Sequence, residues 1–204
     1  MPDQPHDILV IATSPDARQG EVRHRGRTFR CAVGKGGLKP AADKREGDGA
    51  SPIGRYPLRQ VFYRPDHQPT PQTCLPVTAI TPAMGWCDDP SDPAYNQLVP
   101  LPHASSHERL WRDDHLYDLV LVLGHNDDPP RPGLGSAIFL HVARPGYLPT
   151  EGCVALAVED VRCLLQQIGP DEQLEIHPPE HLPTTEHTPE KGHEDTTLPL
   201  TPCP

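Results

Sequence analysis

Short apolar runs separated by proline- and glycine-rich stretches make up most of the chain. A β-strand is recognised as about four to eight residues with alternating apolar positions, or as a continuous apolar run when both faces are buried. Five stretches have this form, at residues 7–13, 20–34, 54–64, 116–126 and 136–143. The second of them is predicted to be a hairpin that turns near Arg25 and Gly26. The pattern therefore predicts a strand-rich domain with long loops.

One segment has the periodicity of an amphipathic helix. The apolar residues that share one helical face in residues 157–169 are Val158, Val161, Leu164, Leu165 and Ile168. Acidic residues in the first turn and Gly169 at the end favour a helix with these limits. A closing strand is expected over residues 172–178. The chain is therefore predicted to be mainly β, with one main helix after position 153.

The last stretch of the chain, residues 178–204, has a different composition. It is rich in Pro, Thr and charged residues and poor in apolar ones, so burial of apolar surface cannot offset the entropy lost on ordering. We therefore expect one folded domain over residues 1–177 and a disordered tail over residues 178–204.

The net charge argues against one broad class of partner. The 204 residues carry a formal charge of −10, and the pI is about 5.6, whereas nonspecific nucleic-acid binding requires clustered Lys and Arg. No apolar run approaches the roughly 20 residues of a membrane-spanning helix. The sequence predicts neither nucleic-acid binding nor a membrane anchor, and it leaves the oligomeric state open.

The cysteines form no recognisable metal or redox motif. They are Cys31, Cys74, Cys87, Cys153, Cys163 and Cys203. Because none of them belongs to a CxxC pair, neither a zinc ribbon nor a thioredoxin-like motif is supported. We predict no metal site and no cofactor, and we expect several of these cysteines to be small buried apolar residues.

A histidine and a cysteine flank one loop, in HVARPGYLPTEGCVAL at residues 141–156. Cys153 becomes a good nucleophile if a nearby positive potential lowers its thiol pKa from about 8.5, and His141, at the end of a predicted strand, could supply that potential. Gly152 permits the backbone conformations and close substrate approach that an oxyanion hole of backbone amides requires. The spacing alone leaves open a hairpin with two buried side chains.

Further motifs accompany this pair. The loop ends in TEGC at Cys153, a GDGxSPxG turn lies within residues 34–58, and WCDDPSDPAYNQLV and SHERLWRDDHLYDLVLVLGHN follow at residues 86–99 and 106–126. Together they resemble the L,D-transpeptidase catalytic domain family, and within it a proteobacterial branch, from about residue 8 to residue 177. The resemblance implies a β-sandwich or mixed sheet.

The same resemblance implies a cysteine acyltransferase whose partner is the stem peptide of peptidoglycan. Cys153 would attack the carbonyl of the third residue of a stem tetrapeptide and expel the terminal D-alanine, with His141 moving the protons. An amine of a second stem would then resolve the thioester into a 3,3 cross-link, without metal or cofactor. Two alternatives remain open: water as acceptor, which makes an L,D-carboxypeptidase, and a non-catalytic module that binds peptidoglycan.

Six residues near the pair or at the end of a predicted strand are candidates for substrate binding. They are Arg144, Tyr147, Thr150, Glu151, His125 and Asn126. A guanidinium can hold a stem-peptide carboxylate through two hydrogen bonds. Glu151 stands where the family has a second histidine, and it would orient His141 or a substrate amine. The alternatives are loop solvation for the loop residues and a capping or turn role for His125 and Asn126.

The N-terminus bears on where the protein works. Residues 1–14 have no basic region, and their apolar stretch is too short for a secretory signal, which predicts the cytoplasm. The resemblance implies the cell envelope or periplasm, because peptidoglycan stems are cross-linked outside the cytoplasmic membrane. The sequence does not choose between these locations.

Overall fold

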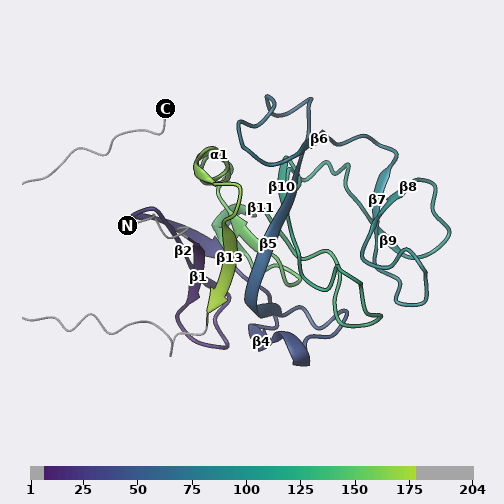
Figure 1. Ribbon diagram of the computed structural model, residues 1–204, viewed down its shortest axis with the longest axis horizontal. Helices are drawn as coiled ribbons and strands as arrows, with labels where there is room; N and C mark the ends of the chain where they lie inside the picture. Colours follow the sequence, from purple (N-terminus) through teal and green to yellow (C-terminus); the bar gives the residue numbers. More distant parts are fainter. Residues whose placement is uncertain (1–6, 178–204) are drawn as a thin grey trace, which may run out of the picture.

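The computed structural model describes residues 7–177 of the chain. Figure 1 shows that strands dominate this part, with one α-helix among them. The strands of the main sheet are β1 (Ile8–Ala12), β2 (Gln19–His24), β3 (Arg27–Ala32), β4 (Leu38–Pro40), β5 (Ser51–Tyr63), β6 (Val77–Ala79), β10 (Leu119–Leu123), β11 (Phe139–Val142), β12 (Val154–Leu156) and β13 (Gln173–His177). Short 3-10 helices lie at Ala41–Asp43 and Pro145–Tyr147. The predicted mainly β fold with one main helix is confirmed.

The main sheet closes on itself through the long strand β5. Its strands follow the order β10-β11-β12-β3-β2-β1-β13-β5-β4, and β5 also pairs with β10. The first half of β5 runs antiparallel to β13, with Gly54 opposite Ile176, and its second half runs antiparallel to β10, with Tyr63 opposite Leu119. Because β11 pairs with β12 in parallel, as β1 does with β13, the sheet is mixed.

Apolar side chains from the inner face of the curved sheet form the main core. Val10, Leu121, Leu140, Leu156 and Leu174 are fully buried in a single cluster. Successive side chains of a strand point to opposite faces, so alternate positions of each strand enter this core. The same alternation is the pattern on which the strand predictions rest.

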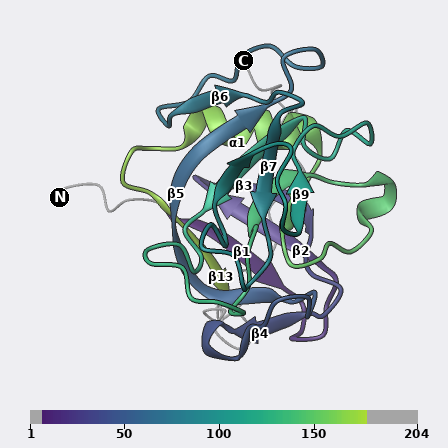
Figure 2. The same ribbon diagram turned by 90° about the vertical axis from the view of Figure 1, so that its right-hand side faces the viewer.

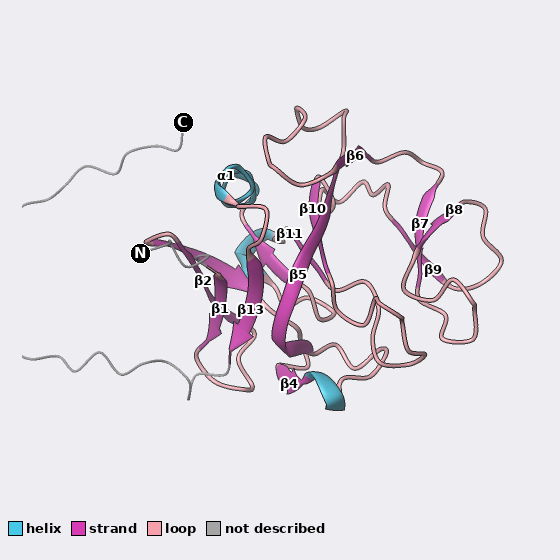
Figure 3. Cartoon of the chain, in the orientation of Figure 1, coloured by secondary structure: helices cyan, strands magenta, loops and turns pink. Residues whose placement is uncertain are grey.

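The helix α1 (Val158–Gln167) packs against β10 and β11, and Figure 3 shows it at one end of the strands. Its buried face carries Val161, Leu164 and Leu165, as predicted. Glu159 and Asp160 lie in the first turn, where their negative charge is favourable to the helix dipole. The helix ends at Gln167, two residues before the predicted stop at Gly169.

A second, smaller sheet was not predicted. It consists of β7 (Met84–Cys87), β8 (Leu98–Pro100) and β9 (His107–Arg109), in the order β8-β7-β9. Figure 2 shows β7 and β9 in front of the main sheet. Trp86 joins the two sheets through edge-to-face contacts with Phe62 and Phe139, at centroid distances of 6.5 and 5.1 Å. Strands of three or four residues among prolines carry too little alternation to be recognised in the sequence.

The remaining local predictions concern the hairpin, the closing strand and the tail. The hairpin β2–β3 turns at Arg25 and Gly26, which both have positive φ angles, 46° and 76°. The closing strand is β13. The predicted disordered tail, residues 178–204, lies outside the described residues. Within residues 7–177, no helix combines the length and the hydropathy that crossing a membrane requires.

Candidate active site

The parallel pair β11–β12 brings His141 and Cys153 onto one face of the main sheet. In its register, Leu140 lies opposite Val154 and His141 lies opposite Ala155. Leu140 and Val154 belong to the main core. Because side chains alternate along a strand, His141 and Cys153 point the other way, toward the second sheet, where Cys153 joins its apolar cluster. The predicted pair is therefore brought together by the sheet.

A cavity of about 510 Å³ opens on this face, and both His141 and Cys153 line it. That volume is typical of a small-molecule or peptide site. Its charged residues are Glu46, Asp88, Glu108, Arg112, Arg144 and Glu151, and its other side chains include Leu116, Tyr117, Ser136, Leu148, Pro149, Thr150 and Ala155. The wall offers both carboxylates and guanidinium groups, so it suits a ligand that carries charges of both signs.

The imidazole of His141 is held as a neutral base. Its Nδ1 lies 2.8 Å from the backbone oxygen of Val142, and because a carbonyl only accepts, Nδ1 carries the proton and Nε2 is left with a lone pair. Burial lowers the pKa of His141 to about 4, and the positive charges of Arg112 and Arg144 act in the same direction. The ring is thus uncharged at neutral pH and ready to accept a proton at Nε2.

The thiol of Cys153 is held in its protonated form. Its Sγ lies 3.2 Å from the backbone oxygen of Ala137, to which it donates, and accepts from the amide of Phe139 at 3.4 Å. Burial raises the pKa of Cys153 to about 12, although the Phe139 amide opposes this shift. Both pKa shifts favour a thiol and a neutral imidazole in the resting site.

Thr150 organises the loop that carries the cysteine. Its hydroxyl donates to the backbone oxygen of Cys153 at 2.6 Å and accepts from the amide of Gly152 at 3.1 Å. Ser51 supports the same carbonyl at 3.4 Å and accepts from the amide of Gly34. Thr150 is buried at the cavity wall, and its hydroxyl is engaged by the backbone of its own loop. Its contact with substrate stays a prediction.

Gly152 is required by the packing of this loop. Its φ angle is +132°, and a Cβ at this position would lie 2.8 Å from the backbone oxygen of Ala50. Larger residues are therefore excluded by both conformation and contact. Since the Gly152 amide already donates to Thr150, the predicted oxyanion role of Gly152 requires that amide to exchange partners when substrate binds.

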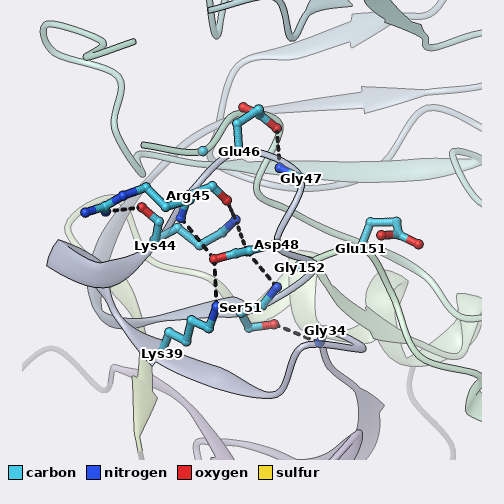
Figure 4. A network of polar contacts seen from close by, with 12 residues as sticks. Gly34, Lys39, Lys44, Arg45, Glu46, Gly47, Asp48, Ser51, Glu151 and Gly152 are labelled. Atoms are coloured by element: carbon cyan, nitrogen blue, oxygen red, sulfur yellow. Dashed lines mark hydrogen bonds and ion pairs between the residues drawn. The ribbon is translucent and has the colours of Figure 1, made fainter. Parts of the chain in front are cut away.

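The GDG turn that abuts Gly152 is built around the carboxylate of Asp48 (Figure 4). Asp48 accepts from the Lys44 ammonium at 2.6 Å and from the amides of Arg45 and Ala50, both at 2.9 Å. Burial alone would raise the pKa of Asp48, but these hydrogen bonds outweigh it and lower the pKa to about 2. The turn supplies Glu46 and Gly47 to the cavity wall, so Asp48 shapes the site without contacting it.

The Asp48→Asn variant is expected to be less stable than the wild type by about 2 kcal/mol at pH 7. The folded-state pKa lies below the ordinary value of 3.8, so this stabilisation is present above pH 3.8 and is lost as the pH falls toward 2. The difference in unfolding free energy between the two proteins, measured in urea, should shrink over that range. Asp43→Asn, in the exposed 3-10 helix before the turn, is the matched control and should show no comparable difference.

Three residues of the cavity wall were not identified from the sequence. The ring of Tyr117 meets that of His141 edge-on, with 5.5 Å between centroids, and its hydroxyl donates to Glu108 at 2.7 Å. The Arg112 guanidinium lies 5.1 Å from the centroid of the Tyr117 ring and donates hydrogen bonds to Glu108 and Asp114. Burial raises the pKa of Glu108, and the bond from Tyr117 and the charge of Arg112 oppose the rise. These residues form a polar wall beside the imidazole.

Two predicted substrate residues lie at the rim of the cavity. Arg144 is exposed and lines it. Glu151 also lines it, but its largely exposed carboxylate forms an ion pair with Lys35 at 2.8 Å. Such an exposed pair contributes little to stability, so Glu151 remains available to a ligand amine. A contact from Glu151 to His141 is not part of the described structure.

Three other predicted substrate residues are engaged elsewhere. Tyr147 lies under the Arg30 guanidinium, 4.5 Å from its ring centroid. His125 is buried and its Nε2 contacts the Leu134 oxygen at 3.1 Å. Asn126 donates to the backbone oxygens of Arg131 and Gly135. None of the three is among the described residues that line the cavity. The hydrogen bonds of His125 and Asn126 to nearby backbone oxygens agree with the turn role that the sequence left open for them.

One family model matches the chain. The model of YkuD, the L,D-transpeptidase catalytic domain, matches residues 9–176. Among solved structures, the crystal structure of Mycobacterium tuberculosis L,D-transpeptidase 1 is 12% identical in sequence, with a TM-score of 0.33. That alignment covers 84% of this chain and 62% of the mycobacterial chain. A search of curated proteins found no match.

Proposed function

Because the chain belongs to the L,D-transpeptidase catalytic domain family, we propose that it is a cysteine acyltransferase that forms 3,3 cross-links between peptidoglycan stem peptides. The observation that carries this proposal is the placement of His141 and Cys153 on one face of the β11–β12 pair, at the wall of the same cavity. A base and a thiol that line one cavity are what acyl transfer through a thioester requires.

The first half-reaction would begin from the neutral pair. As Sγ of Cys153 bonds to the carbonyl carbon of the third stem residue, its proton passes to Nε2 of His141. When the tetrahedral intermediate collapses, the bond to the terminal D-alanine breaks. D-alanine leaves as an amine that has taken the proton from His141, and a thioester on Cys153 remains.

The second half-reaction would reverse these roles. An amine of a second stem attacks the thioester carbonyl while His141 accepts the proton of that amine. Cys153 is then expelled as the new amide forms, and its sulfur recovers the proton from His141. The enzyme returns to the thiol and the neutral imidazole, so all protons are accounted for without a cofactor.

Because Cys153 and His141 are buried and neutral, the thiol proton is expected to move to the imidazole while the sulfur attacks the substrate. A thiolate formed in advance would be disfavoured by burial, which raises the pKa of Cys153 to about 12. Transfer of the proton to His141 during attack avoids a free thiolate, and the negative charge develops on the substrate oxygen. Backbone amides near Cys153 are the groups proposed to stabilise that oxygen.

The charges of the cavity fit the ends of a stem peptide. Arg112 is already bonded to Asp114 and Glu108, so Arg144, exposed at the rim, is the guanidinium proposed to hold a stem carboxylate. Glu151, whose carboxylate is largely exposed, would attract the amine of the acceptor. A positive site for the donor and a negative site for the acceptor favour an amine over water as the second substrate.

The test is product analysis after incubation of the full-length protein with a disaccharide-tetrapeptide. Free D-alanine together with a cross-linked dimer is the expected result. Release of D-alanine with tripeptide alone would overturn the cross-linking part of the proposal and identify an L,D-carboxypeptidase. No turnover by folded protein, with the substrate still bound, would overturn catalysis and identify a peptidoglycan-binding module.

A further inference from the structure

A group of potential metal ligands lies in the second sheet, apart from His141 and Cys153. It consists of Cys87, Asp92 and His103, whose Sγ, carboxylate oxygen and ring nitrogen all lie within 4.8 Å of one another. Cys87 ends β7 and is fully buried, while the side chains of Asp92 and His103 are 14% and 20% exposed. No CxxC or HExxH motif marks this group in the sequence, because Cys87, Asp92 and His103 belong to different parts of the segment.

One polar atom of the group, the ring nitrogen Nε2 of His103, is incompletely bonded. His103 Nε2 is 3.2 Å from Asp92 Oδ2, but the pair lacks hydrogen-bond geometry, and within the described part of the chain this buried nitrogen has no hydrogen-bond partner. The Asp92 carboxylate accepts from the side chain of Ser105, and its Oδ1 accepts from the amide of Ala94 at 2.7 Å. That bond orients the carboxylate so that its other oxygen faces His103, as two ligands of one ion would face each other.

Negative charge collects around the thiol of this group. Asp88, Asp89 and Asp92 all act electrostatically on Cys87. One buried carboxylate oxygen, Asp88 Oδ1, also has no hydrogen-bond partner among residues 7–177. Carboxylates beside a thiol attract a cation and so favour its binding there.

We propose that Cys87, Asp92 and His103 bind a zinc ion. One sulfur, one nitrogen and one oxygen donor form a set that suits zinc, which is borderline-soft and is usually held by four ligands. A water molecule would complete the tetrahedron. Binding replaces the proton of the Cys87 thiol by the metal, so one proton is released to solvent for each ion bound.

The other histidine cluster of the described chain is less suited to a metal. His67 and His115 both direct Nδ1 at the carboxylate of Asp118, at 2.7 and 3.1 Å, which satisfies that carboxylate. The guanidinium of Arg64 lies 3.5 Å from His67 Nε2. Its fixed positive charge would repel a cation. Within the described residues, neither Asp92 nor His103 forms an ion pair with Lys or Arg, so the group around Cys87 is the better site.

Zinc at this position would order the segment that supports the catalytic thiol. Asn96, in the loop between Asp92 and His103, accepts from the amide of Ala137 at 3.0 Å and from Trp86 at 2.9 Å. The carbonyl of Ala137 in turn accepts from Cys153. Zinc would therefore tie Asp92 to His103 and hold Asn96 between them. Asn96 bonds Ala137, which is a hydrogen-bond partner of Cys153.

The test is zinc binding by the full-length protein, first stripped of metal with a chelator. Isothermal titration and elemental analysis should show one tight site, and Cys87→Ser and His103→Ala should each weaken it by at least about tenfold. The matched controls are Cys74→Ser, an exposed cysteine, and His115→Ala, from the other cluster; both should bind zinc as the wild type does. Wild-type binding by both Cys87→Ser and His103→Ala would overturn the proposal.

A cobalt titration supplies a readout that is specific for the sulfur ligand. Cobalt bound to the wild type should show a sulfur-to-metal charge-transfer band in the near ultraviolet, which Cys87→Ser should lack and Cys74→Ser should keep. The band would be absent from the wild type, or would persist in Cys87→Ser, if Cys87 were not a ligand. Should Cys87→Ser fail to fold by circular dichroism, Asp92→Asn replaces it in the zinc titration, with the same expected loss.

Discussion

Replacing Cys153 by alanine is expected to reduce the release of D-alanine from a disaccharide-tetrapeptide by at least about a thousandfold. The thioester cannot form without the sulfur, and the cavity contains no second thiol to replace it among its lining residues in the described chain. The substitution removes only the contacts of Sγ with Ala137 and Phe139, so the fold should persist. D-Alanine release under single-turnover conditions, with circular dichroism as a check on folding, measures the effect.

The matched control for this variant is Cys74→Ala. Cys74 is exposed, and its thiol donates to the backbone oxygen of Ile168, away from the cavity. This variant should release D-alanine at the wild-type rate. Turnover by Cys153→Ala at a rate near that of Cys74→Ala would contradict the role of Cys153 as nucleophile.

Replacing His141 by asparagine is expected to slow D-alanine release by about 10²- to 10⁴-fold, the usual contribution of a positioned general base. The asparagine amide can still donate to the Val142 oxygen, as Nδ1 of His141 does, but it offers no base in place of Nε2. The loss should therefore appear in kcat with the fold intact. His177→Asn, in the closing strand β13, is the control and should retain wild-type activity.

The pH profile distinguishes a base from a structural residue. The base must be neutral, so activity is lost as the pH falls through the pKa of His141, which burial lowers to about 4. For the wild type, D-alanine release should remain nearly constant down to about pH 5, one unit above that pKa. An acid limb centred near 6.5, the ordinary histidine value, would contradict a buried neutral imidazole. The residual activity of His141→Asn should lack the limb near pH 4.

Much of the main sheet could be predicted because its strands are long enough to show alternation. Residues 116–126 and 136–143 contain the apolar runs of β10 and β11, and the single amphipathic segment became α1. The second sheet escaped prediction for the opposite reason. Strands such as Leu98–Pro100 are defined by their partners, and three residues cannot display a period.

The site was predictable only in its centre. The spacing of His141 and Cys153 alone left a plain hairpin open, and the resemblance of the surrounding motifs to a known family singled the pair out. Tyr117 reaches the imidazole, and Glu108 reaches Tyr117, through tertiary packing between different segments, which no local pattern encodes. The neutral state of the pair could not be predicted either, since it follows from burial.

His125 shows why a strand end is a weak indicator of a site. It lies two residues after the end of β10, a position from which side chains often reach ligands, but its ring packs edge-on against Tyr56 and contacts the Leu134 oxygen. Burial lowers its pKa. The segment after β10 folds back so that Leu134 contacts the His125 ring. The sequence does not predict this course of the chain.

Intact-mass spectrometry of the full-length protein, quenched with acid during turnover of a disaccharide-tetrapeptide, tests the thioester mechanism most directly. We expect the wild type to gain the mass of the substrate less D-alanine, with peptide mapping placing the adduct on Cys153, and we expect no gain in Cys153→Ala. Turnover by the wild type through an adduct on a different residue, or an adduct that persists in Cys153→Ala, would contradict the mechanism.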